Sequence, residues 1–162
     1  MNSKLQSLIS ELISLPMPTI AAITGHASAA GMIFALSHDY VLMRKDRGFL
    51  YMSELDVGLV LPDWFMVVLK CKIGDAKVRG EIAMRAAKLT AEMAVSGGIL
   101  HSAHDSAEET FEAAVRLGEE LAKREWDGSI YGKNRMVVLS EILEKIRIDQ
   151  TLEAEINSRS KL

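Results

Sequence analysis

Apolar side chains recur at helical spacing near the start of the chain, and an uncharged β-branched segment follows them. Leu5, Leu8, Ile9 and Leu12 fall on one face of a helix over residues 2–14. The prolines within residues 15–18 end that helix, because proline lacks the N–H that a continuing helix needs. Residues 19–24 contain four β-branched side chains and no charge, which predicts a buried strand.

Short strands and helices then alternate as far as residue 104. The pattern predicts strands at 39–44 and 49–51, a buried helix from residue 31 and a small extended piece at 99–101. It also predicts a helix that opens at Pro62-Asp63 and ends before Gly74, and helices at 76–87 and 90–97. Pro62 and Asp63 are a usual helix start, and Thr90 is a usual helix cap. This alternation is typical of an α/β core.

From Ser106 onward the pattern is helical only. Ser106 and Glu109 fit a capping box, and the helix they open has its apolar face at Phe111, Ala114, Val115, Leu121 and Ala122. A last helical stretch runs from about residue 129 to 157, and we expect an interruption near Asp149. We therefore divide the chain into an α/β core over 1–104 and a C-terminal helical region over 105–162.

The segment from Thr19 to Pro62 carries the candidate chemistry. A strand, a tight loop of small residues from Gly25 to Gly31 and a buried helix follow one another there. The first N–H groups of a helix have no partner inside it, so those of Ala30 and Gly31 can hold a developing oxyanion.

Glu54 follows this loop between two apolar stretches. It lies between the strand-like Phe49–Tyr51 and the apolar run from Val57. A carboxyl group in apolar surroundings can exchange a proton near neutral pH, although most isolated glutamates are simply solvated. One proton shuttle and a set of oxyanion donors are enough to move a double bond that lies next to a carbonyl.

These residues resemble a known family. The loop Gly25-His-Ala-Ser-Ala-Ala-Gly31, the pair Asp39-Tyr40 and the segment Ser53-Glu-Leu-Asp-Val-Gly58 are similar to the enoyl-CoA hydratase/isomerase (crotonase) superfamily. The detail looks most like its plant peroxisomal Δ3,Δ2-enoyl-CoA isomerases, and the likeness continues through Lys88–Leu100. The resemblance covers nearly the whole chain and implies a crotonase-like ββα spiral core.

The resemblance also implies roles for particular residues. Glu54 aligns with the glutamate that takes a proton from C2 of a 3-enoyl-CoA and returns it at C4, giving the trans-2-enoyl-CoA. The N–H of Ala30 matches one of two oxyanion donors, with Ala29 and Gly31 beside it in the substrate site. Hydratases of this superfamily have a second glutamate where this chain has Ile33. Isoleucine cannot activate water, so the resemblance favours an isomerase over a hydratase.

Other side chains near this segment could have either a functional or a structural role. Trp64 and Phe65 either line an acyl-chain tunnel or belong to the core. His26 has no second metal ligand at suitable spacing, so a structural role is favoured. Six bases between residues 70 and 88 could meet CoA phosphates, but a solvated helix face is the more common meaning.

Composition narrows the choice of ligands and partners. A net charge of −3 argues against a nucleic-acid partner, and the single cysteine, Cys71, excludes an internal disulfide and a cysteine metal cluster. We expect no metal and no cofactor, since CoA is part of the acyl-CoA thioester substrate. No apolar run is long enough for a membrane span. By resemblance, the protein is a homo-oligomer, a trimer or a hexamer.

The chain ends in Ser160-Lys161-Leu162, the signal that the peroxisomal import receptor reads. Together with the resemblance, this ending places the protein in the peroxisome, where we expect it to serve β-oxidation of unsaturated fatty acids.

Family members carry further residues before the segment that matches Leu5, and these supply the first ββα turns of the spiral. We therefore expect an N-terminally truncated core with an exposed edge at the 19–24 strand, without the second oxyanion donor. Two other classes of function stay open. One is a catalytically weak or inactive subunit that assembles with full-length family members, and the other is an enzyme of different chemistry, such as a hydratase or thioesterase.

Overall fold

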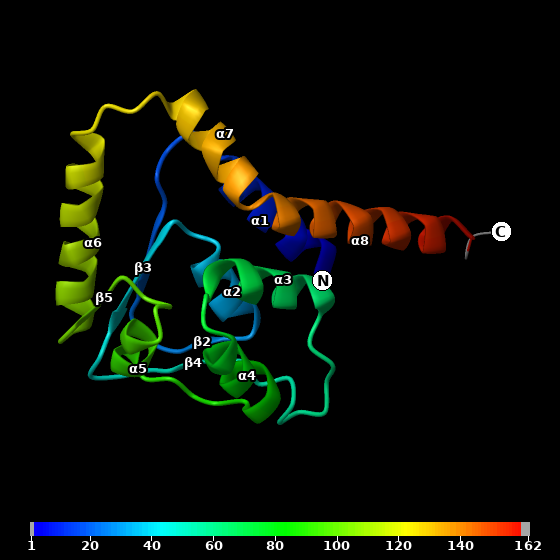
Figure 1. Cartoon of the computed structure of the whole chain (residues 1–162), viewed down its shortest axis with the longest axis horizontal. Helices are drawn as coiled ribbons and strands as arrows, with labels where there is room; N and C mark the ends of the chain where they lie inside the picture. The colour runs from blue at the N-terminus through cyan, green and yellow to red at the C-terminus, as the bar shows by residue number, and fades with distance from the viewer. Residues whose placement is uncertain (1, 160–162) are drawn as a thin grey trace.

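Two small parallel sheets form the centre of the fold. The computed structural model describes the backbone of residues 2–159 and the side chains of residues 3–152. Strands β1 (Ile20–Ile23), β3 (Tyr40–Arg44) and β5 (Ser102–His104) form one sheet in the order β1-β3-β5. Strands β2 (Ala27–Ser28) and β4 (Leu50–Tyr51) form the other. Figure 1 shows the strands lying between α6 on one side and α2 on the other.

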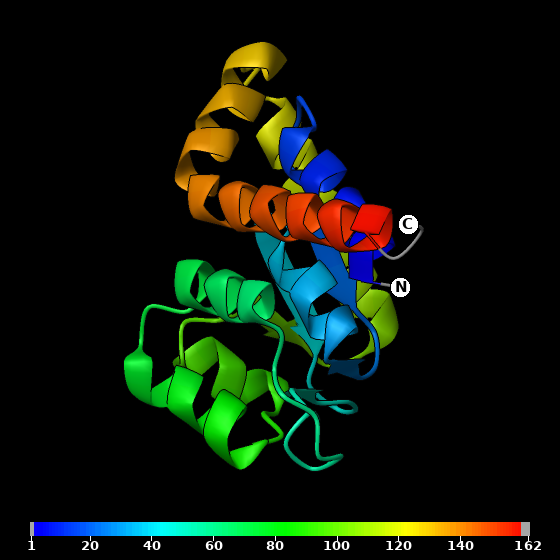
Figure 2. The ribbon, with the colours of Figure 1, turned by 90° about the vertical axis from the view of Figure 1, so that its right-hand side faces the viewer.

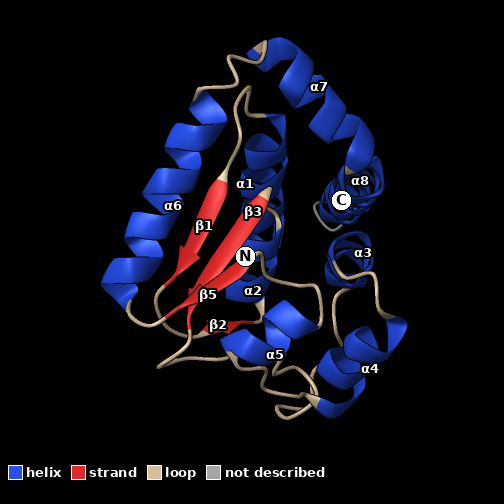
Figure 3. Cartoon of the chain, turned by 60° about the vertical axis from the view of Figure 1, so that its left-hand side comes forward, coloured by secondary structure: helices blue, strands red, loops and turns tan. Residues whose placement is uncertain are grey.

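Helices surround these sheets. They are α1 (Asn2–Ser14), α2 (Ala30–Leu36), α3 (Asp63–Lys72), α4 (Ala76–Arg85), α5 (Ala91–Ser96), α6 (Ala107–Ala122), α7 (Gly128–Val138) and α8 (Ser140–Arg159). Helix α6 covers one face of the three-stranded sheet and α2 lies against the other (Figure 3). Helix α8 runs alongside α3, with α4 on the other side of α3 (Figure 2). The α/β class with a helical C-terminal part is confirmed.

The chain passes between parallel strands through helices, as parallel pairing requires. Strand β1 is joined to β3 through α2, and Ile20 lies opposite Tyr40. Strand β3 is joined to β5 through α3, α4 and α5, and Leu42 lies opposite Ser102. The predicted extended piece at 99–101 therefore forms slightly later, at 102–104, because only there does the chain reach β3.

Strand β1 is less buried than the sequence pattern predicts. Only Ile23 is buried, while Ile20, Ala21 and Ala22 are half-buried. Within the described residues β1 pairs with β3 alone, so its other side is a sheet edge. The prediction of a fully buried strand was wrong, while the expectation of an exposed edge is confirmed.

The apolar face predicted for α6 was also wrong. Phe111 is 63% exposed and Val115 is 44% exposed, whereas Thr110 and Ala113 are buried. The Thr110 hydroxyl donates to the Ser106 carbonyl at 2.6 Å. A buried threonine satisfied in this way is not costly, so the helix turns its Thr110 side, rather than Phe111, toward the sheet.

The C-terminal helices break at Leu139 and not near Asp149. Leu139 lies between α7 and α8 with a non-helical backbone, and its side chain is buried. Asp149 continues the helix because Lys145, one turn earlier, holds its carboxylate at 3.1 Å. Figure 1 shows α8 extending beyond the rest of the chain.

The core joins both predicted regions. Its largest members include Ile9 and Ile13 from α1, Ile33 from α2 and Trp64 from α3, and Ile142 from α8 belongs to the same cluster. Since α6 lies against β1 and β3, the separation into 1–104 and 105–162 stays a prediction. No helix in the described part of the chain is both long and apolar enough to cross a membrane. The predicted signal at Ser160, Lys161 and Leu162 lies outside the described residues.

Candidate active site

The loop before α2 lies alongside the strand that leads to Glu54. Strand β2 pairs with β4, with Ser28 opposite Tyr51. The Ala27 N–H donates to the Phe49 carbonyl at 2.9 Å, and the Ala29 N–H donates to the Tyr51 carbonyl at 3.0 Å. These bonds extend the ladder up to the residue before Ala30. The short parallel ladder therefore brings the end of the loop before Ala30 next to the strand that leads to Glu54.

A glycine lets two loops approach at the base of this ladder. Gly48 has a φ of 99°, and a Cβ atom added there would lie 2.2 Å from the Gly25 carbonyl oxygen. Any side chain at Gly48 would displace the turn that carries the chain from β1 to β2. The Gly25 turn and the β3–β4 turn thus hold each other in place.

The beginning of α2 has the shape expected of an oxyanion loop. Ala29 has a φ of 48°, in the left-handed region that non-glycine residues rarely adopt. Ala30 and Gly31 follow as the first helical residues, and both are exposed. The amide of Ile33 donates to the Ala29 carbonyl at 3.0 Å, so helical bonding begins only after them. The N–H groups of Ala30 and Gly31 therefore have no partner within α2.

Glu54 is buried beside this loop. Its side chain is 8% exposed, and its Oε2 atom has no hydrogen-bond partner among the described residues. The preceding residue touches the loop, since Ser53 Oγ lies 3.5 Å from Ser28 Oγ. The Glu54 carbonyl accepts from the Leu59 N–H at 2.8 Å, which closes a turn after it. A buried carboxylate oxygen without a partner can accept a substrate proton.

The segment after Glu54 exposes apolar side chains. Leu55, Val57, Leu59 and Val60 are all more than half exposed, and Val60 reaches 91%. This apolar loop, residues 55–60, leads directly into α3. Such a surface is suited to contact an acyl chain or another protein.

A cavity of about 440 Å³ lies next to the Gly25–Gly31 loop. Its walls come from β1, from the turn over 24–27 and from α2, and they include Gly31 and His38. Glu54 is not among the residues that line it. The structure thus joins Glu54 to the loop through Ser53 and Ser28, and not through this cavity.

Ile33, Trp64 and Phe65 lie in the interior, whereas His26 is exposed. Ile33 is wholly buried, so an apolar side chain fills the position that the resemblance gives to the second glutamate of hydratases. Trp64 and Phe65 are 1% and 5% exposed and pack edge to face at 4.5 Å. This packing fits the core reading, and a role in an acyl-chain tunnel stays a prediction. His26 stacks on Phe49 at 5.7 Å, which fits a structural role.

The six bases of residues 70–88 do not form one patch. Lys70, Lys77, Arg85 and Lys88 are exposed, and Arg85 pairs with Glu81. Arg79 instead donates to the Gly74 carbonyl, and Lys72 donates to the His38 carbonyl at 2.7 Å. Among the described residues no three metal-ligand side chains cluster as a metal site would need. The absence of a metal stays a prediction.

Sequence reasoning missed two features of this region. The Ser28–Ser53 contact escaped it because serines give no pattern until β2 and β4 are paired. The ion pair between Arg135 and Asp39, at 2.9 Å, joins residues far apart in sequence. Only the alignment of Asp39 with the family motif marked one of its members.

Comparison with known proteins places this geometry in a family. The sequence model described as enoyl-CoA hydratase/isomerase matches residues 1–158. The chain belongs to the enoyl-CoA hydratase/isomerase family. The resemblance to this family is thereby confirmed, while the roles of Ala30 and Glu54 stay predictions.

Two plant members of this family are close in sequence. The chain is 60% identical over 143 residues to the peroxisomal enoyl-CoA delta isomerase 1 of Arabidopsis thaliana, covering 88% of this chain and 60% of that protein. It is 51% identical over 136 residues to the peroxisomal enoyl-CoA delta isomerase 2 of the same plant, covering 83% and 57%. The chain therefore spans about 60% of the length of these relatives.

A solved structure confirms the fold of this family member. An enoyl-CoA hydratase from Mycobacterium ulcerans superposes with a TM-score of 0.82 at 24% identity. The match covers 95% of this chain and 66% of that one. The crotonase-like core followed by C-terminal helices is thus confirmed.

Proposed function

We propose that this chain is a Δ3,Δ2-enoyl-CoA isomerase, which converts a 3-enoyl-CoA to the trans-2-enoyl-CoA. The observation that carries the proposal is the buried Glu54 carboxyl group, whose Oε2 atom has no partner, on the segment that contacts the oxyanion loop. The identity to two peroxisomal enoyl-CoA delta isomerases supports it.

Each part of the site has a defined task in this reaction. The Glu54 carboxylate takes a proton from C2, and the electrons of the C–H bond move into a dienolate whose negative charge lies on the thioester oxygen. The Ala30 N–H donates to that oxygen, and one such donor is worth about 3 kcal/mol in comparable sites. Protonated Glu54 then returns the proton at C4, and the double bond lies between C2 and C3.

Hydration is disfavoured by the residue at position 33. Adding water across the double bond needs a group that orients and deprotonates the water, in addition to the acid. Ile33 is wholly buried and carries no polar atom on its side chain. The proposal therefore assigns proton transfer within the substrate, without a water molecule as reactant.

An assay of the purified chain tests this proposal. A 3-enoyl-CoA is supplied, and the absorbance of the conjugated product and the amount of 3-hydroxyacyl-CoA are followed together. The proposal predicts conjugated product without hydroxyacyl product, and a rate that chelator and dialysis leave unchanged, since no metal or separate cofactor takes part. Hydroxyacyl product from a 2-enoyl-CoA would indicate a hydratase instead.

An assembly role is the second candidate. The exposed edge of β1 and the exposed apolar loop 55–60 favour contact with another chain. By family resemblance that partner is another copy, in a trimer or hexamer, or a longer family member. Light scattering gives the molar mass of the chain alone and of its mixture with the Arabidopsis isomerase 1, and so distinguishes self-assembly from assembly with a longer family member. Absence of turnover in the assay together with co-assembly would support an inactive subunit.

The proposed place of this reaction is the peroxisome, during β-oxidation of unsaturated fatty acids. Two relatives carry that location in their names, and Ser160-Lys161-Leu162 fits the signal of the import receptor. A fluorescent fusion at the N-terminus of the full chain should enter peroxisomes, while the same fusion without the last three residues should stay outside. If the fusions with and without the last three residues were distributed in the same way in the cell, the peroxisomal location would be contradicted.

A further inference from the structure

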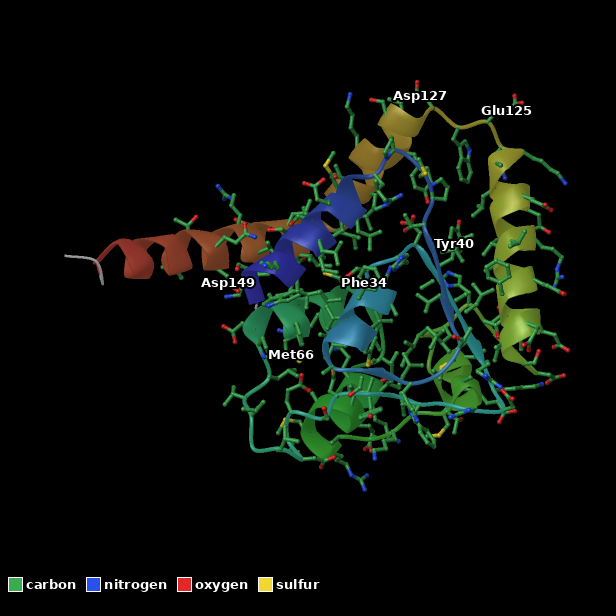
Figure 4. All side chains as sticks on the ribbon, turned by 180° about the vertical axis from the view of Figure 1, so that it is seen from behind. Phe34, Tyr40, Met66, Glu125, Asp127 and Asp149 are labelled. Atoms are coloured by element: carbon green, nitrogen blue, oxygen red, sulfur yellow. The ribbon has the colours of Figure 1, made fainter. Side chains whose placement is uncertain are left out.

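A second cavity lies away from Glu54, between the sheet and the C-terminal helices. Its volume is about 670 Å³, within the range of small-molecule sites. Its walls come from the start of β3, the end of α3 and helix α7. Figure 4 labels Tyr40 and Asp127 on two of these walls. Neither Glu54 nor Ala30 lines this cavity, so the proposed isomerase chemistry does not use it.

Two side chains bring unused hydrogen-bond donors to this cavity. Lys72 donates to the His38 carbonyl at 2.7 Å, and its ammonium group has two further N–H bonds. The Nδ1 atom of His101 accepts from the Val41 N–H at 3.1 Å, which leaves Nε2 as the donor of the neutral ring. Burial lowers the pKa of Lys72 and that of His101, and the nearby Lys72 charge adds to the effect at His101.

The remaining charges at the cavity already have partners. Asp39 accepts from the N–H and hydroxyl of Thr19 and pairs with Arg135 at 2.9 Å. Arg135 also donates to the Leu12 and Met17 carbonyls. Asp127 caps α7 by accepting from the Ile130 N–H at 3.0 Å. Among the described residues Lys72 forms no ion pair, so its ammonium group is the cation at this cavity that a ligand carboxylate can approach.

The other end of the cavity is apolar. Ile130 is 55% exposed, Val138 is 75% exposed and Trp126 is 45% exposed, and all three line it. Trp126 stacks on Tyr131 at 5.5 Å, which makes a flat wall. Covering these side chains with hydrocarbon would contribute roughly 25 cal/mol for each Å² removed from water. The cavity thus offers donors at one end and apolar surface at the other.

We propose that this cavity binds a small monocarboxylate with an apolar tail. The carboxylate accepts hydrogen bonds from Lys72 and His101, and the tail lies against Trp126, Ile130 and Val138. A dianionic phosphate fits less well, because Asp39 and Asp127 also line this space and repel two negative charges more strongly than one.

Binding of octanoate to the purified full chain tests the proposal. Calorimetry gives the affinity, and the fluorescence of Trp126 reports contact with the tail. Acetate carries the charge without the tail, 1-octanol carries the tail without the charge, and inorganic phosphate tests the dianion. We expect octanoate to bind about tenfold or more tightly than any of the three. Equal or tighter binding of acetate, octanol or phosphate would overturn the assignment.

Two lysines on α3 provide a matched pair of variants. Lys72→Met should weaken octanoate binding about tenfold or more, because it removes a charged donor. Lys70→Met changes an exposed lysine of the same helix and should leave binding unchanged. Trp126→Phe should remove the fluorescence change while binding persists in calorimetry. Equal affinity of the Lys72→Met variant and the unaltered chain would contradict the proposal.

A spectroscopic measurement on the unaltered chain covers the case in which Lys72→Met does not fold. Octanoate should shift the ring resonances of His101 more than those of His26, which does not line the cavity. The Glu54→Gln variant should show the same shift, since this cavity is separate from Glu54. Shifts confined to His26, or lost in Glu54→Gln, would place the binding outside this cavity and overturn the proposal.

Discussion

Ser28 Oγ and Ser53 Oγ lie 3.5 Å apart, and through this contact the loop before Ala30 meets the residue before Glu54. Ser28 lies in β2, and Ser53 follows two residues after β4, the strand that pairs with β2. The contact is long for a bond between hydroxyls, so it marks proximity more than strength.

A double-mutant cycle on Ser28 and Ser53 measures this proximity. Each change to alanine should cost little, and the two together should depart from additivity by about 0.5 kcal/mol in the free energy of unfolding, at the low end for residues in contact. Ser28→Ala combined with Ser129→Ala, on α7, serves as the additive control. Strict additivity of Ser28 and Ser53 would show that the two segments do not touch in solution.

Replacing Gly48 with alanine should destabilise the fold by about 2 kcal/mol or more. The new Cβ would both occupy a strained backbone conformation and collide with the Gly25 carbonyl oxygen. Gly98→Ala is the matched control, because Gly98 has a φ of 68° but open space around it. Urea unfolding should show a clearly smaller decrease in the free energy of unfolding for Gly98→Ala than for Gly48→Ala. Similar decreases for the two variants would mean that the close approach of Gly48 to Gly25 does not add to the cost.

The buried pair of Arg135 and Asp39 should be sensitive to loss of one member. Arg135→Met leaves the Asp39 carboxylate without its cation and frees the Leu12 and Met17 carbonyls, so we expect a cost of about 3–5 kcal/mol. Arg116→Met breaks an exposed pair with Glu112 and should cost less than about 1 kcal/mol. Denaturant unfolding curves of the two variants give these costs. A smaller decrease in the free energy of unfolding for Arg135→Met than for Arg116→Met would contradict the buried ion pair between Arg135 and Asp39.

Stability should fall as the pH drops through the usual histidine range. Burial lowers the pKa of His38 and of His101, so the unfolded chain binds protons more readily than the folded one. Their contribution is fully present above the unfolded pKa of about 6.5 and is lost as the pH falls from there toward the folded pKa. Unfolding curves between about pH 7.5 and 5 test this. The double variant His38→Gln, His101→Gln should flatten the dependence, and an unchanged slope would exclude both groups.

The order of elements could be predicted because it rests on local signals. The prolines after α1, Asp63 at the start of α3, and the caps Thr90 and Ser106 all act within a few residues of themselves. The loop and Glu54 could be placed by the resemblance. Their contact follows from a pairing of two-residue strands, which carries no periodic pattern.

The burial of individual side chains was harder to predict, because it depends on which other elements pack against them. Phe111 is exposed although it is the most apolar residue of its turn, and Thr110 takes the place against the sheet through its bond to Ser106. Strand β1 has an apolar sequence but lies at an edge. Lys72 belongs to a basic run in sequence, yet it turns inward to the His38 carbonyl. The burial of β1 and Lys72 depends on partners that are distant in the sequence. The burial of Thr110 depends on a side-chain hydrogen bond that a pattern of apolar residues does not reveal.

In the proposed reaction the Glu54 carboxyl group carries the proton between C2 and C4. This role is tested by the rate at which the Glu54→Gln variant converts a 3-enoyl-CoA to its conjugated isomer, with the exposed Glu92→Gln as the control. Glutamine keeps the shape but cannot accept the proton, so we expect a loss of about 10²- to 10⁴-fold for Glu54→Gln and an unchanged rate for Glu92→Gln. An undiminished rate in a folded Glu54→Gln variant would show that Glu54 does not transfer the proton.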